Sequence, residues 1–205
     1  MTLGPLIIDI EGLTLTSEDE DILKHPLIGG VILFSRNYES KKQLSSLTKK
    51  IKSIHRNEEL LICVDQEGGR VQRFKKDFTL LPSFSKIGKT WNLSSSSSIS
   101  NVVSDSIKYG NILGNELKDV GVDLSFTPVL DIDWARSEVI GDRSFGSDPH
   151  KVIVMASSMM HGLLMSGMKN CAKHFPGHGW ALSDSHIEDA IDERKFVDIE
   201  KNDLV

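Results

Sequence analysis

The sequence predicts an α/β fold with a parallel sheet, built as about the first five β/α units of a (β/α)8 barrel of the TIM type. Short apolar runs alternate with amphipathic helical segments along the chain, which is typical of parallel strands joined by helices. Each apolar run ends in polar or charged residues. Such residues are expected at the carboxyl ends of barrel strands, where active sites of this fold gather.

The length of the chain bears on how much of the barrel is present. A complete barrel takes about 250 residues, whereas this chain has 205 and reaches Val205 without a terminating signal. We therefore interpret residues 1–205 as the N-terminal portion of a single barrel domain, truncated at its C-terminus, with the remaining strands absent. The alternative is a complete doubly wound fold of five strands.

The N-terminal elements are two strands and the helix between them. Residues 6–10 are an apolar run that predicts the first strand. Ser17 and Glu20 have the spacing of a capping box, so a short helix is expected to start there and to stop near Pro26. A second apolar run predicts a strand at residues 30–34.

The central elements follow from a helical repeat and a serine run. Ser40 is expected to cap a helix whose apolar residues recur at helical spacing, namely Leu44, Leu47, Ile51 and Ile54. Residues 60–64 predict the third strand. After a long connection, the serine run at residues 94–98 marks a surface loop, which leads into a helix at about residues 99–118.

The C-terminal elements continue the alternation. Residues 124–130 predict the fourth strand, which ends at Asp131 and Asp133. A helix at about residues 149–165 leads to the fifth strand at residues 170–174, and a polar, helix-like segment follows a loop rich in Gly, His and Asp.

Charge and cysteine content exclude several classes of partner. The net charge of −5 and the scattered lysines give no reason to expect nucleic acid, which requires clustered Lys and Arg. No apolar run approaches the roughly 20 residues of a membrane span, and no signal peptide is visible. Cys63 and Cys171 lie in apolar runs and suit reduced thiols. We therefore expect a cytoplasmic protein, with no membrane partner.

The first segment with chemical potential follows the third strand. Asp65 stands at the strand end, two glycines allow a sharp turn, and Arg70 and Arg73 follow. A carboxylate suits bidentate hydrogen bonding to sugar hydroxyls, and a guanidinium supplies a rigid fork of donors. A structural Asp–Arg pair explains this composition equally well.

The second segment is a glycine-flanked loop that carries Arg143 close to Phe145. This arginine is placed either to bind a substrate or to hold the loop in position. The residues alone favour neither alternative.

The third segment is the most informative. Lys173 and His174 begin a Gly- and Pro-rich loop, and Asp184 and His186 follow it. A metal site is disfavoured because Lys173 adds positive charge and the spacing matches no helical His pair or Cys/His cluster. An Asp two residues before a His suits a dyad in which the carboxylate orients the imidazole and stabilises its cationic form. Taken by itself, His186 is better explained as an exposed loop histidine.

Taken together, these segments resemble the family 3 glycoside hydrolases, and closely their bacterial β-N-acetylglucosaminidase branch that acts in peptidoglycan recycling. The resemblance begins at Gly4-Pro5, covers essentially the whole chain in order, and rests on five further segments. These are residues 29–37, 65–73, 126–131, 140–146 and 173–179.

The resemblance implies a role for each candidate residue. Five residues would line the pocket for a terminal N-acetylglucosamine, namely Asp65, Arg73, Arg143, Lys173 and His174, while Arg70 would support them from behind. His186 would be the general acid/base and Asp184 its orienting partner. The expected substrate is N-acetylglucosaminyl-anhydro-N-acetylmuramic acid, with or without peptide, and the mechanism is retaining. No cofactor or metal is implied, and we expect a monomer.

One part of the family's machinery has no match in this chain. The aspartate nucleophile belongs to a later segment of the family, and neither Asp131 nor Asp133 is assigned to that role, since acids at strand ends more often order neighbouring loops. Two alternatives therefore stay open: a family phosphorylase, because a neutral histidine tolerates phosphate, and a sugar-binding relic without catalysis. We also expect residues 177–187 to be mobile.

Overall fold

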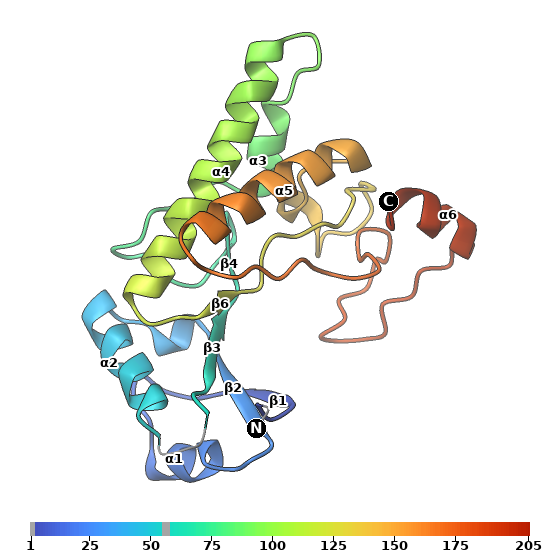
Figure 1. The fold of residues 1–205 in the computed structure, drawn as a ribbon. Helices are drawn as coiled ribbons and strands as arrows, with labels where there is room; N and C mark the ends of the chain where they lie inside the picture. The colour runs from blue at the N-terminus through green and yellow to red at the C-terminus, as the bar shows by residue number, and fades with distance from the viewer. Residues whose placement is uncertain (1–2, 55–57) are drawn as a thin grey trace.

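The computed structural model describes residues 3–54 and 58–205. Its main sheet has four parallel strands in the order β1 (Leu6–Asp9), β2 (Ile28–Leu33), β3 (Leu61–Val64) and β6 (Leu124–Ser125) (Figure 1). The strand order follows the chain order. A doubly wound sheet reverses its order at a switch point, so this arrangement favours the barrel prediction over that alternative.

The strands predicted at 124–130 and 170–174 are only partly formed. Regular pairing of β6 stops at Ser125, and residues 170–174 form no strand. This part of the chain is instead paired through two isolated parallel bridges, Leu124 to Lys169 and Val129 to Lys173. Pro128 has no N–H to donate, which interrupts the ladder. Backbone bonds such as Lys173 N to Pro128 O, 3.1 Å, still hold the two segments side by side.

The predicted helices are present, with small differences at their ends. They are α1 (Ser17–Leu23), α2 (Lys41–Lys52), α4 (Ser96–Asp119), α5 (Pro149–Met165) and α6 (Phe196–Asn202). Ser40 caps α2 as expected. The capping box of α1 lies one residue earlier than predicted, because Thr16 and Asp19 form it. Ser95 caps α4, so this helix starts within the serine run.

Several short elements were not predicted. Directly after β3, β4 (Gln66–Gly68) and β5 (Val71–Gln72) form an antiparallel hairpin. Gly68 and Gly69 have φ values of 119° and 56°, which glycine adopts without strain. The helix α3 (Phe84–Lys89) lies in the long connection. Two 3-10 turns occupy Ser35–Asn37 (η1) and Gly141–Arg143 (η2).

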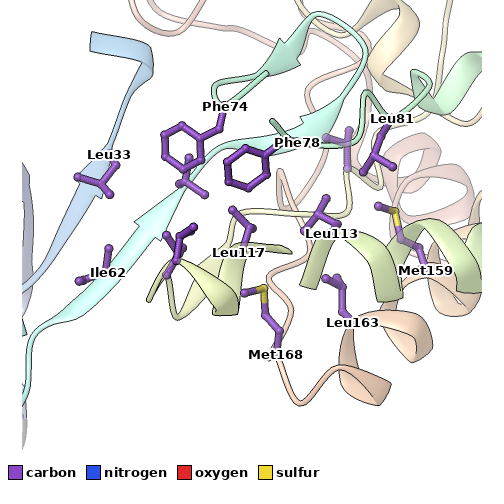
Figure 2. Packing of buried hydrophobic residues seen from close by; sticks show 14 of the residues in the cluster. Leu33, Ile62, Phe74, Phe78, Leu81, Leu113, Leu117, Met159, Leu163 and Met168 are labelled. Carbon is purple, nitrogen blue, oxygen red and sulfur yellow. The ribbon is translucent and has the colours of Figure 1, made fainter. Parts of the chain in front are cut away.

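The core extends from the sheet to the pair of long helices. Figure 2 shows Leu33 and Ile62 of β2 and β3, the aromatic rings of Phe74 and Phe78, and apolar residues of α4 and α5, all in one buried cluster. The helices α4 and α5 approach closely at Gly162, where an added Cβ would lie 2.0 Å from a backbone oxygen of α4. The packed sheet and helices form the rigid framework from which the loops of the candidate site extend.

Within the described residues, no helix is both long and apolar enough to cross a membrane.

Candidate active site

A cavity of about 350 Å³ lies where the segments after β3, the β4–β5 hairpin, the Arg143 loop and the 171–186 segment meet. Six of the seven predicted site residues line it, namely Asp65, Arg73, Arg143, Lys173, His174 and His186. The seventh, Asp184, does not line the cavity but is hydrogen-bonded to His186. Residues separated by more than 100 positions in sequence therefore face one pocket.

Lys173 lines this pocket and lies between two carboxylates. Its Nζ donates a hydrogen bond to Asp65 Oδ1 at 2.6 Å and lies 2.7 Å from Glu67 Oε1. The Glu67 side chain is only 2 % exposed, so its charge is held away from water and depends on these partners. Glu67 was not among the predicted site residues.

Arg143 shares the Glu67 carboxylate with Lys173. Its Nη2 and Nε donate to the two Glu67 oxygens at 2.8 and 3.0 Å, the bidentate geometry typical of Arg–carboxylate pairs. Burial alone would lower the pKa of Arg143, but the hydrogen bonds and charge of Glu67, together with the charges of Asp131 and Asp65, outweigh it and raise the pKa above its ordinary value. The guanidinium is thus firmly cationic.

The loop that presents Arg143 is itself held in place by Arg70. Arg70 Nε donates to Asp142 Oδ1 at 2.9 Å, and its Nη2 donates to the carbonyls of residues 138 and 139 at 2.8 and 2.7 Å. On the other side of the loop, the Phe145 ring stacks on Phe84 of α3 with centroids 4.4 Å apart. Arg70 therefore holds the loop that carries Arg143, which is the supporting position that the sequence predicts for it.

Arg73 is held more loosely than Arg143. Its Nη2 is 4.0 Å from Asp65 Oδ2, and its guanidinium carbon lies 5.7 Å from the centroid of the Phe34 ring. Among the described residues, its buried Nε has no hydrogen-bond partner. Arg73 therefore brings donors to the pocket that the protein itself does not fully use.

The other wall of the pocket is organised around Asp131. Its Oδ2 lies 2.6 Å from His174 Nδ1, and its Oδ1 accepts the backbone N–H of His178 at 2.7 Å. The His178 ring also lines the cavity, with its centroid 6.0 Å from that of His174. Asp133, by contrast, accepts the backbone N–H of Ala135 at 2.9 Å. Both acids therefore accept backbone N–H groups of the loops that follow them or lie beside them.

The predicted dyad of Asp184 and His186 is formed at the rim of the pocket. His186 Nδ1 lies 2.7 Å from Asp184 Oδ1, which also accepts the His186 backbone N–H at 3.0 Å. These two hydrogen bonds lower the pKa of Asp184, the backbone one most strongly, so this carboxylate is ionised at neutral pH. The His186 ring is 87 % exposed, so it borders the cavity while remaining largely in water.

The arrangement of acidic and histidine side chains also bears on metal binding. Among the described residues, no group of three or more His, Cys, Asp or Glu side chains is arranged to hold a metal ion. Lys173 occupies the space between Asp65 and Glu67 where a cation would otherwise be attracted.

Comparison with known proteins identifies the family. Residues 7–205 match the glycosyl hydrolase family 3 N-terminal domain. The chain belongs to glycosyl hydrolase family 3. It is 48 % identical over 205 residues to a protein of Nitrosospira multiformis named beta-hexosaminidase, and 52 % identical over 204 residues to its namesake from Nitrosomonas eutropha. These alignments cover all of this chain and 57 % of each relative.

A solved structure supports the same family assignment. NagZ from Neisseria gonorrhoeae, in complex with N-trifluoroacetyl-D-glucosamine, matches with a TM-score of 0.93 and 44 % identity, covering 100 % of this chain and 59 % of that one. The family 3 N-terminal domain is a TIM-barrel-type α/β fold, so the predicted fold class is confirmed. The chain spans a little over half the length of these three relatives.

Sequence reasoning missed three residues of this family 3 pocket: Glu67, Asp131 as a partner of His174, and His178. Glu67 had a usable signal, because side chains two positions apart in extended backbone face the same way and Asp65 was already a candidate. The Asp131 contact had none, since its partner is 43 residues away.

Proposed function

We propose that this family 3 chain carries the sugar pocket and the acid/base dyad of a retaining β-N-acetylglucosaminidase. The activity would remove terminal, non-reducing, β-linked N-acetylglucosamine from muropeptide fragments during cell-wall recycling. The observation that carries the proposal is the single cavity that collects Asp65, Arg73, Arg143, Lys173, His174 and His186. The relatives named beta-hexosaminidase, and the glucosamine derivative bound by NagZ, support the same class of substrate.

The proposed pocket binds a sugar through complementary donors and acceptors. Asp65 offers carboxylate oxygens to hydroxyl groups, while Arg73 and Lys173 donate to sugar oxygens. Because Glu67 and Asp65 fix Lys173 on two sides, the Lys173 ammonium is oriented before the ligand arrives. This preorganisation reduces the entropy lost on binding.

In the proposed reaction, the imidazolium of His186 protonates the glycosidic oxygen as the bond to the sugar breaks. An aspartate from a later segment of the family would attack the anomeric carbon and form a glycosyl-enzyme. The neutral His186 would then take a proton from water as that water hydrolyses the intermediate. Asp131 does not fit the nucleophile's role, because both of its oxygens are occupied by His174 and His178.

Asp184 is the proposed orienting group for this proton transfer. Its carboxylate fixes the His186 ring through Nδ1, which leaves Nε2 as the atom that exchanges a proton with the substrate. Since the ring is largely exposed here, we propose that residues 177–187 move toward a bound substrate.

We also propose a cytoplasmic monomer that uses no metal or cofactor.

The test is release of p-nitrophenol from its β-N-acetylglucosaminide by the protein expressed from its native gene, in phosphate-free buffer. His186→Ala should lower turnover about 10²- to 10⁴-fold, and His161→Ala, an exposed position on α5, is the matched control. The loss should be larger with a muropeptide substrate, because a sugar leaving group needs protonation more than nitrophenolate does.

The alternatives give different outcomes in the same assay. Turnover that requires added phosphate and yields a sugar phosphate would identify a phosphorylase. Binding of N-acetylglucosamine without turnover would identify a sugar-binding protein. A folded protein that neither binds nor cleaves the sugar would refute the proposal.

A further inference from the structure

The acid/base dyad lies in a long irregular segment between α5 and α6 (Figure 1). We name residues 181–193 of this segment the dyad loop, since Asp184 and His186 belong to it. Among the described residues, the hydrogen bonds of residues 182–191 are local ones, such as that from the backbone N–H of Ile187 to the carbonyl of Asp184 at 2.9 Å. The position of the dyad is therefore decided where the loop joins the rest of the fold.

The dyad loop leaves the fold directly after Trp180. The residue before it, Gly179, is packed so closely that an added Cβ would lie 1.8 Å from the carbonyl oxygen of Ile132. The Trp180 ring lies edge-on to that of Trp134, with centroids 5.5 Å apart, and Ala181 is buried. The departure point is thus fixed to the segment that follows β6.

The loop returns to the fold at Arg194. The guanidinium carbon of Arg194 lies 4.8 and 4.7 Å from the ring centroids of Trp134 and Trp180, so the cation fills the corner between the two rings. Its Nε and Nη2 donate to Asp192 at 3.0 and 2.6 Å, and its Nη1 donates to Asp203 Oδ2 at 2.8 Å. Asp203 also accepts the Nε1–H of Trp134 at 3.2 Å. Because only 9 % of the Arg194 side chain is exposed, one largely buried cation joins the two ends of the loop.

We propose that Arg194 is a positioning residue for the acid/base dyad. By closing the base of the dyad loop on Trp134 and Trp180, it keeps both ends of the loop in one place, so that His186 approaches and leaves the pocket along a restricted path. A guanidinium suits this task because its planar fork binds carboxylates while its face stacks on aromatic rings, which an ammonium cannot do.

This inference rests on the proposed function and confines the movement proposed for residues 177–187 to the part beyond Trp180. A general acid acts only when it is within hydrogen-bond reach of the leaving oxygen. If the return end of the loop were released, His186 would sample positions outside that reach, although Asp184 would still orient its ring. A misplacement of about 1 Å can lower a rate about 10²-fold. The effect of Arg194 would therefore pass through the position of His186 and not through the sugar.

The restriction of the loop can be measured without any substrate. Spin labels are attached through a genetically encoded keto amino acid at Ile187, which is 84 % exposed on the loop, and at His161 on α5. Arg194→Lys keeps a charge beside the buried Asp203 but gives up the fork, and Lys195→Met, at an exposed neighbouring position, is the matched control. We expect electron–electron resonance to give a broader distribution of distances between the labels in Arg194→Lys and an unchanged one in Lys195→Met. An equally narrow distribution in Arg194→Lys would overturn the inference.

Two leaving groups then separate positioning from a general loss of structure. The phenyl and p-nitrophenyl β-N-acetylglucosaminides are compared through kcat/KM, which reports the steps up to cleavage of the glycosidic bond. Phenolate needs a proton to leave, whereas nitrophenolate leaves with little help. We expect Arg194→Lys to lower kcat/KM about tenfold or more for the phenyl substrate, to lower it less for the nitrophenyl substrate, and to keep the affinity for N-acetylglucosamine within about twofold of wild type.

A double variant tests whether Arg194 acts through His186. In the His186→Ala background, Arg194→Lys should cause no further loss, because the group that it positions is gone. A further loss there, or an equal fall in both substrates and in sugar affinity, would overturn the positioning role and leave the proposed function standing. A broader distance distribution in Arg194→Lys, in a protein that neither binds nor cleaves the sugar, would refute the proposed function but support the anchoring of the loop by Arg194.

Discussion

The buried carboxylate of Glu67 offers the sharpest test of how the pocket is held together. In Glu67→Gln, one carboxylate oxygen becomes an amide NH₂ group. The Arg143 guanidinium donates to both Glu67 oxygens, and the Lys173 ammonium lies 2.7 Å from one of them. The new NH₂ group must therefore face another donor, and both cations lose the charge that offset their burial.

The magnitude follows from the burial of the group. Each hydrogen bond to a charged partner contributes about 1.5–3 kcal/mol, and removing one partner of a buried ion pair costs about 3–5 kcal/mol. Glutamine keeps one acceptor oxygen and Lys173 keeps Asp65, so the lower end applies. We expect the free energy of unfolding to fall by about 3 kcal/mol, which lowers the melting temperature by about 6–12 °C for a chain of this size.

Urea titration followed by circular dichroism measures this loss, and Glu138→Gln is the matched control. Glu138 is exposed on the loop that carries Arg143, so its substitution should change stability by no more than about 0.5 kcal/mol. A double variant, Glu67→Gln with Arg143→Met, should lose less than the sum of the single losses, because one unpaired cation has been removed. A loss below about 1 kcal/mol for Glu67→Gln, at an unchanged denaturant slope, would refute the ion-pair reasoning.

Three further predictions concern thiols, pH and helix packing. Burial raises the pKa of Cys63 to about 12, so a thiol reagent at pH 8 should label Cys171 and not Cys63. Because Cys171 borders the pocket, N-acetylglucosamine should slow its labelling. Mass spectrometry that finds Cys63 modified in folded protein would contradict this prediction. The hydrogen bond from Arg194 lowers the pKa of Asp192. The ionised Asp192 therefore stabilises the fold above the ordinary carboxyl pKa of about 4, and this stabilisation is lost as pH falls through the lowered pKa. Asp192→Asn should flatten the acid side of a plot of melting temperature against pH. Gly162→Ala gains about 1 kcal/mol in helix propensity but places a Cβ 2.0 Å from a backbone oxygen of α4. Because the α4 backbone is held by its own hydrogen bonds, we expect the free energy of unfolding in urea to fall by about 1–2 kcal/mol. A more stable variant would show that the two helices can separate.

The parts of the fold that the sequence predicted are those with a local cause. Ser40 begins α2 because its hydroxyl accepts a backbone N–H three residues later, and α5 follows Asp148 and Pro149 as a cap and first helical residue should. The hairpin after β3 and the short α3 were missed because their strands and helix are too short for periodicity to register. The fourth strand was predicted too long, since apolar character continues past Ser125 although Pro128 breaks the ladder. The fifth predicted strand is reduced to isolated bridges for the same reason.

The sequence predicted which residues line the cavity better than it predicted the hydrogen bonds and ion pairs between them. Asp65, Arg73, Arg143, Lys173, His174 and His186 do face one cavity, because the segments that follow the parallel strands gather at one end of this fold. The partner of each was not predictable. Glu67 and Arg143 are 76 residues apart, and which carboxylate reaches which cation depends on the paths of loops that carry no periodic signal. The roles of these residues remain predictions.

The two halves of the proposed machinery are held in different ways, and the difference suits their tasks. The cations and carboxylates of the sugar pocket are fixed by contacts between distant segments, such as Glu67 with Arg143 and Asp131 with His174, so that pocket can keep its shape when empty. The dyad depends on one contact between neighbours, Asp184 and His186, which would persist wherever the loop moves. An acid/base group carried in this way can keep its orientation relative to its own carboxylate while it approaches and leaves the substrate. The sugar would be recognised by the rigid part, and protonation of the leaving group would be governed by the position of the loop.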